Sequence, residues 1–163
     1  MTQGRHRMIP ALTAHLVIIA LVAGGTPALA AEHPHHAHGS ALTLDQGRKW
    51  PTDAPLREGM ARIRASMSRA LPGVRAGSFS PSEYRALAAD VEGSVAYVVE
   101  NCRLEGDADT VLHGLIARVL DGVHAMQGGS PVQTPAEGVA QVSGALAEYG
   151  RLFDDPGWAP LTR

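Results

Sequence analysis

The residues of this sequence best suited to chemistry are the histidines that follow residue 30. His33, His35, His36 and His38 lie within six residues that show no apolar periodicity. Histidine-rich tracts are typical of metal binding, because imidazole is a ligand for copper, nickel and zinc. A solubilising polar linker is the alternative interpretation.

The first 30 residues have the three parts of a secretory signal peptide. Arg5 and Arg7 form a basic start, residues 11–23 are almost wholly apolar, and residues 28–30 (Ala-Leu-Ala) provide the small side chains that precede a cleavage site. The apolar stretch is shorter than the roughly 20 residues of a membrane-spanning helix. We therefore expect cleavage after residue 30 and a periplasmic or secreted protein with no stable membrane span. An uncleaved membrane anchor is the alternative.

Cleavage at this position would create a specific metal site. The new N-terminus reads Ala31-Glu32-His33, so a free amine is followed by a histidine at the third position. The amine, the amide nitrogens of Glu32 and His33 and the imidazole of His33 then offer four nitrogens in one plane. Tetragonal nitrogen ligation selects Cu(II) or Ni(II), and no proline removes a required amide N–H.

A second candidate site combines the single cysteine, Cys102, with His113. A tight turn predicted at Gly106-Asp107 would make the flanking helices antiparallel and place both side chains at a similar height at one end of the domain. Met60 is predicted near the same end, and thiolate, imidazole and thioether ligands together suit Cu(I). The alternative is structural, because cysteine and methionine are often buried in protein cores.

Other functions find little support in the sequence. It contains no Cys-x-x-Cys-His haem attachment motif, nucleotide-binding glycine loop or nucleophile elbow, so we do not expect an enzyme. Loss of Arg5 and Arg7 with the signal peptide lowers the formal net charge from −2 to −4, which argues against nucleic-acid binding. A haem held without covalent attachment, through His113 or His124, is a weaker alternative.

Four amphipathic segments that must position these residues follow further along the chain. Apolar residues recur every three or four positions in residues 53–71, 80–102, 108–127 and 134–154, which predicts four helices. The breaks between and after them are rich in proline, glycine and aspartate: Pro72-Gly73, Gly106-Asp107, Gly128-Gly129 and Asp155-Pro156-Gly157. The arginines of the first segment are expected to form a solvated face: Arg57, Arg62, Arg64 and Arg69.

This pattern predicts an all-α protein with an up-down-up-down four-helix bundle. A three-helix core with a loosely attached fourth helix is the alternative. Because every apolar stripe lies beyond Trp50, we expect a signal peptide in residues 1–30, a disordered histidine-rich arm in residues 31–50 and the bundle in residues 51–163.

Several blocks of the sequence resemble the DnrO-like family of small exported proteobacterial proteins. The blocks are residues 42–45, 47–53 and 55–57, Ala96-Tyr97, Asn101-Cys102, Leu112-His113, Tyr149-Gly150 and Pro156-Gly157-Trp158. The resemblance covers about residues 42–161 and implies export, but it supplies no activity. The family label is shared with a DNA-binding regulator, a role against which an exported acidic bundle argues.

Taken together, these residues predict a periplasmic metal-binding protein, with copper as the expected metal, that acts as a scavenger, buffer or carrier. The metal ion is the expected partner, and the sequence identifies no protein partner. The alternative is a periplasmic interaction or stress-response bundle that binds no metal.

Overall fold

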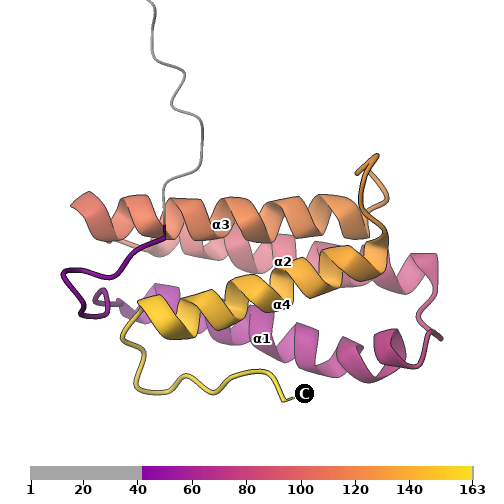
Figure 1. Cartoon of the computed structure of the whole chain (residues 1–163), viewed down its shortest axis with the longest axis horizontal. Coiled ribbons are helices and arrows are strands. Elements are labelled where there is room, and N and C mark those ends of the chain that lie inside the picture. Colours follow the sequence, from indigo (N-terminus) through magenta and orange to yellow (C-terminus); the bar gives the residue numbers. More distant parts are fainter. Residues whose placement is uncertain (1–41, 163) are drawn as a thin grey trace, which may run out of the picture. The chain divides into compact units, whose positions relative to one another are not determined.

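The computed structural model describes residues 42–162, whose main elements are four α-helices joined by short loops (Figure 1). The helices are α1 (Ala54–Arg75), α2 (Pro81–Asn101), α3 (Gly106–Met126) and α4 (Pro135–Leu152). Successive helices run in opposite directions, and the described part of the chain contains only isolated β-bridges and no strand. The predicted all-α, up-down-up-down four-helix bundle is confirmed.

Three of the four helices begin where the sequence predicts, because a side chain caps their first free N–H groups. The Asp53 carboxylate accepts a hydrogen bond from the Leu56 amide at the start of α1. Ser80 and Glu83 form a reciprocal capping box at α2, and Thr134 and Glu137 form another at α4. A proline occupies the first turn of each of these helices, where its missing N–H costs no hydrogen bond.

The first helix is longer than the sequence predicts. Pro72-Gly73 was expected to end it, but α1 continues through Pro72 to Arg75. The helix ends instead in a Schellman motif: Gly77 adopts a positive φ of 66° and its N–H bonds to the Val74 carbonyl, while the Ser78 amide bonds to Gly73. Pro72 is tolerated because only one helical hydrogen bond is lost, one turn before the end.

The turn between α2 and α3 also differs from its predicted position. Gly106-Asp107 was expected to form the turn, but α3 begins at Gly106, and the chain reverses over residues 102–105. Gly106 has a φ of 61°, a left-handed conformation that glycine adopts without strain. Cys102 therefore caps the end of α2 and lies at the very end of the bundle.

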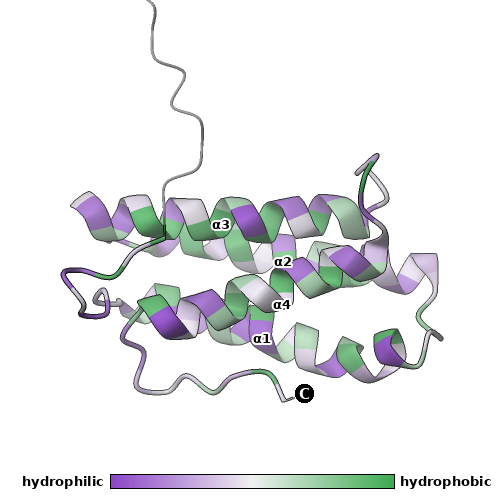
Figure 2. Ribbon diagram, viewed as in Figure 1, coloured by the Kyte–Doolittle hydropathy of each residue, from purple (hydrophilic) through white to green (hydrophobic). Residues whose placement is uncertain are grey.

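Apolar side chains from all four helices fill the space between them, and Figure 2 shows green apolar residues alternating with purple polar ones along each helix. Each fully buried aliphatic side chain contributes about 1.5–3 kcal/mol to folding. The largest side chains that are almost fully buried are Leu56, Met60, Ile63 and Met67 of α1, Val91 and Val98 of α2, Leu115 and Met126 of α3, Leu146, Tyr149 and Leu152 of α4, and Phe153.

The bundle consists of two closely packed helix pairs. α3 packs most extensively against α4, and α1 packs next most extensively against α2, whereas α1 packs less extensively against α4 than α2 does against α3. The fourth helix is thus firmly attached, unlike in the three-helix alternative. The segment after α4 returns along the loose α1–α4 side, where Trp158 packs edge-on against Tyr149 and Arg75 donates to the Thr162 carbonyl (Figure 1).

Residues 42–50 pack against the bundle, although the sequence predicts a mobile arm as far as residue 50. Leu42 belongs to the core with 9% of its surface exposed, and Leu44 and Trp50 pack against it. The Trp50 amide donates to the Leu152 carbonyl, and the Asp154 amide donates to the Trp50 carbonyl. Isolated apolar residues without a helical period carry no sequence signal, which is why the pattern missed this segment.

None of the helices in residues 42–162 is both long enough and apolar enough to cross a membrane.

Candidate functional site

The residues of the predicted terminal metal site lie outside the described part of the chain. They are Ala31, Glu32, His33, His35, His36 and His38. The signal peptide predicted for residues 1–30 also lies outside it. The described candidates are therefore Cys102, His113 and the residues around them.

Cys102 is half-buried at the end of α2 and lies against Asp53, the N-cap of α1. Burial raises the pKa of the Cys102 thiol, and the nearby Asp53 carboxylate, to which the thiol is hydrogen-bonded, raises it further. Because the thiolate is the form that binds metals and reacts as a nucleophile, this setting makes Cys102 a poorer ligand than an ordinary cysteine.

Asp53 joins two elements at this end of the bundle. One carboxylate oxygen accepts from the Leu56 amide at 2.8 Å, and the other accepts from the Arg103 amide at 2.7 Å. Burial acts to raise the pKa of Asp53, but these two hydrogen bonds, with that of Cys102, hold the pKa below its usual value. The ionised carboxylate therefore stabilises both the start of α1 and the α2–α3 turn.

Replacement of Asp53 by alanine should lower the free energy of unfolding by about 2–3 kcal/mol, because it removes a helix cap and also the hydrogen bond from the Arg103 amide to a charged acceptor. Denaturant unfolding at pH 7 measures the loss. Ser80→Ala is the matched control, since Ser80 caps only its own helix, and it should cost about 1 kcal/mol. Equal losses in the two variants would contradict the joining role.

The same contacts make the contribution of Asp53 to stability depend on pH. Because its native pKa is lowered, its contribution is present above the unfolded pKa of about 3.9 and is lost as the pH falls through the native value. The free energy of unfolding of Asp53→Asn should therefore fall less between about pH 6 and about pH 3 than that of the unmodified protein. An identical pH dependence would show that the Asp53 carboxylate is not selectively stabilised in the native state.

His113 faces solvent on α3, with 69% of its side chain exposed. Its Nδ1 lies 2.9 Å from the Asp109 carbonyl and 3.3 Å from an Asp109 carboxylate oxygen, so the ring is held by its own helix. His113 lies seven residues beyond Gly106, or about 10 Å along the helix axis. No hydrogen bond or ion pair within residues 42–162 joins Cys102 to His113, and the similar height of the two side chains stays a prediction.

Among the described residues, no group of three or more histidine, cysteine, aspartate and glutamate side chains is arranged to hold a metal ion. Met60, the third predicted Cu(I) ligand, is buried in the core with 2% exposure. The Cu(I) site at Cys102 and His113 stays a prediction. The described residues around these two side chains provide no third ligand for it. His124, the other residue considered for haem, is exposed on α3.

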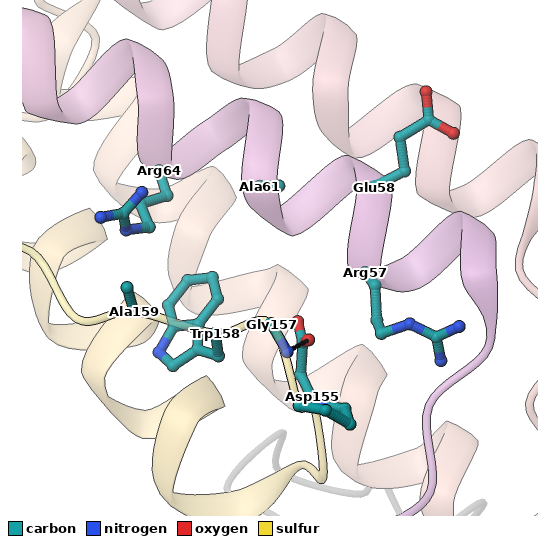
Figure 3. Close-up of a pocket in the computed structure, with 9 residues that line it drawn as sticks. Arg57, Glu58, Ala61, Arg64, Asp155, Gly157, Trp158 and Ala159 are labelled. Carbon is teal, nitrogen blue, oxygen red and sulfur yellow. Dashed lines mark hydrogen bonds between the residues drawn. The ribbon is translucent and has the colours of Figure 1, made fainter.

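A groove of about 550 Å³ lies between α1 and the segment that follows α4 (Figure 3). Arg57, Ala61 and Arg64 line it from α1, and Asp155 and Trp158 line it from the other side. The sequence predicts a solvated face for the α1 arginines, and Arg62 and Arg69 are indeed exposed. In contrast, Arg57 and Arg64 are half-buried in the groove.

A sequence signal for this groove exists but is incomplete. Arg57, Ala61 and Arg64 are spaced by four and three residues, so they share one face of α1. The path of residues 155–159 could not be predicted, because it depends on contacts that Tyr149 makes. The Tyr149 hydroxyl donates to Asp155 at 3.0 Å, and its ring packs against Trp158 with a centroid distance of 4.7 Å.

Comparison of the chain with protein-family models, curated proteins and solved structures finds no match. The resemblance to the DnrO-like family therefore rests on the sequence blocks alone.

Proposed function

We propose that this chain is exported and that its mature form binds Cu(II) through its N-terminus, as a scavenger, buffer or carrier of the metal. The observation that carries the proposal is the order of residues 28–33, in which a cleavage signal directly precedes Ala31-Glu32-His33. A free amine, two amide nitrogens and an imidazole form three fused chelate rings around one metal ion. Ni(II) fits the same geometry, and Cu(II) leads in affinity.

Metal binding and folding of the bundle depend on different residues. The metal ligands belong to residues 31–33, whereas the bundle packs around an apolar core that does not include them. Metal binding in this protein is thus not needed to fold the helices, in contrast to zinc fingers, whose folding energy comes from the metal. A metal bound by ligands that belong to the chain terminus can be passed to another protein without unfolding the bundle, which suits a carrier.

The mature protein should bind one equivalent of Cu(II) with the visible absorption band of a square-planar nitrogen site. His33→Ala should abolish the band, because one of the four nitrogen ligands is lost, while His113→Ala should leave it unchanged. Titration of the exported protein with Cu(II), followed by absorbance, measures both. Mass spectrometry of that material should give Ala31 as its first residue.

A one-residue extension before Ala31 separates the terminal site from general histidine affinity. The extension moves His33 to the fourth position and breaks the chelate rings, but it leaves His35, His36 and His38 intact. We expect the square-planar band to disappear. An extended protein that binds Cu(II) as tightly and with the same spectrum would refute the terminal site, as would a mature chain that begins elsewhere.

A further inference from the structure

The groove between α1 and residues 155–159 contains a positive charge, that of Arg64, which no other described residue pairs with. The Nε atom of Arg64 is buried and has no hydrogen-bond partner within residues 42–162. No acidic side chain in the described part of the chain forms an ion pair with Arg64 either. A buried donor without an acceptor costs about 1–3 kcal/mol, and more when it is charged, so the fold itself leaves the Arg64 guanidinium without a partner.

The acidic residues that line the groove do not pair with Arg64. Glu58 points away from the groove (Figure 3). Its carboxylate accepts from the Tyr97 hydroxyl at 2.7 Å and pairs with Arg62. Asp155 uses one carboxylate oxygen for the Tyr149 hydroxyl and the other for the Gly157 amide, each at 3.0 Å. Both carboxylates therefore have their own donors, and neither is paired with Arg64.

The remaining lining gives the groove a second, apolar character. Trp158 presents its indole to the groove, and Ala61 lines the α1 side with a small side chain (Figure 3). Arg57 adds a second positive charge, although its guanidinium already donates to Thr52, to the carbonyl at 2.9 Å and to the hydroxyl at 3.1 Å. A volume of about 550 Å³ is within the range of small-molecule sites.

We propose that this groove binds a small organic carboxylate, whose anionic group pairs with Arg64 and whose flat apolar part packs against Trp158. Arginine suits this role because its planar guanidinium donates two parallel hydrogen bonds to a carboxylate. The aromatic face adds affinity for an unsaturated ring. The site lies within the bundle and uses none of the residues of the proposed metal terminus, so each can fail without the other.

The test is a titration of the ¹⁵N-labelled full mature protein with sodium benzoate, followed by nuclear magnetic resonance of its side-chain N–H groups. The chain has two tryptophans, so the Trp158 indole signal is readily distinguished from that of Trp50. Benzoate should shift the signals of Trp158 and of Arg64 Nε–H saturably, with a Kd of about 1 mM or lower, and should leave Trp50 in place. Benzamide, which has the same shape without the charge, should shift neither.

Variants on α1 provide matched controls. Arg64→Gln should weaken benzoate binding roughly tenfold, because a charge-assisted pair is lost. Arg69→Gln makes the same change on the same helix at an exposed position outside the groove and should leave the affinity unchanged. Absence of a saturable shift with benzoate, or equal shifts with benzamide, would overturn the proposal. Inorganic phosphate that shifts Arg64 more than benzoate does would overturn the organic part of it.

Discussion

Replacement of Gly138 by alanine should lower the free energy of unfolding by about 3 kcal/mol, although it adds only one methyl group. A Cβ atom at Gly138 would lie 2.5 Å from the Gly122 carbonyl oxygen and 2.9 Å from the Cβ of Ala125. The obstacles are backbone atoms of α3 and a short side chain, which cannot rotate away. The two helices would have to separate along the most extensive interface of the bundle.

Gly144 provides the matched control on the same helix. A Cβ there would meet nothing within 4 Å, so Gly144→Ala should raise the free energy of unfolding by about 0.5–1 kcal/mol through the better helix propensity of alanine. Thermal and denaturant unfolding should therefore give changes of opposite sign for one chemical substitution in one helix. A midpoint about 10 °C lower for Gly138→Ala is expected for a domain of this size.

Gly122→Ala tests the same contact from the other helix. Its Cβ would lie 2.8 Å from the Gly138 carbonyl oxygen and 2.7 Å from a methyl group of Val142, so a similar loss is expected. If both Gly122→Ala and Gly138→Ala were as stable as the unmodified protein, α3 and α4 would not cross at the short distance that the structure gives.

The sequence pattern places these two glycines in the core, but it does not identify the helix that each of them contacts. Gly122 lies three residues after Val119 and four before Met126, and Gly138 lies four before Val142, so both occupy the apolar stripes of their helices. A glycine at a core position suggests a close helix approach. The partner helix cannot be read from either stripe alone, because the pairing depends on how all four helices are arranged.

Local chemistry explains why the helix starts were predicted correctly. The Ser80–Glu83 and Thr134–Glu137 capping boxes are formed by residues three apart, so the short sequence contains the whole interaction. The end of α1 was misplaced because Pro72 is a strong helix breaker on average, whereas the actual stop depends on the left-handed conformation of Gly77. The two signals lie five residues apart, and the sequence does not rank them.

The groove was missed for a different physical reason. Four of its nine lining residues come from α1, where the arginine spacing is visible, and the other five are residues 155–159, which have no periodic pattern. The position of these five residues depends on Tyr149, a residue whose side chain is fully buried and whose pKa is raised by that burial. Because this burial is a tertiary property, the groove becomes visible only in the folded chain.

Deletion of residues 31–50 should lower the free energy of unfolding by about 2–4 kcal/mol, whereas deletion of residues 31–41 should leave it nearly unchanged. The difference arises in residues 42–50, which place Leu42 in the core and pack Trp50 against it. Two backbone hydrogen bonds join Trp50 to Leu152 and Asp154, and the Trp50 indole N–H donates to the Thr43 carbonyl at 2.7 Å. Thermal unfolding followed by circular dichroism compares the two proteins.

Point variants identify which contacts are responsible for this loss. Trp50→Ala should account for much of it, because the indole both packs against the core and holds the Thr43 carbonyl. Lys49→Ala is the control, since the exposed Lys49 ammonium makes a single hydrogen bond, to the Gly150 carbonyl, and such a surface contact contributes less than about 1 kcal/mol. Equal unfolding midpoints for the two deletions would mean that residues 42–50 do not fold cooperatively with the bundle.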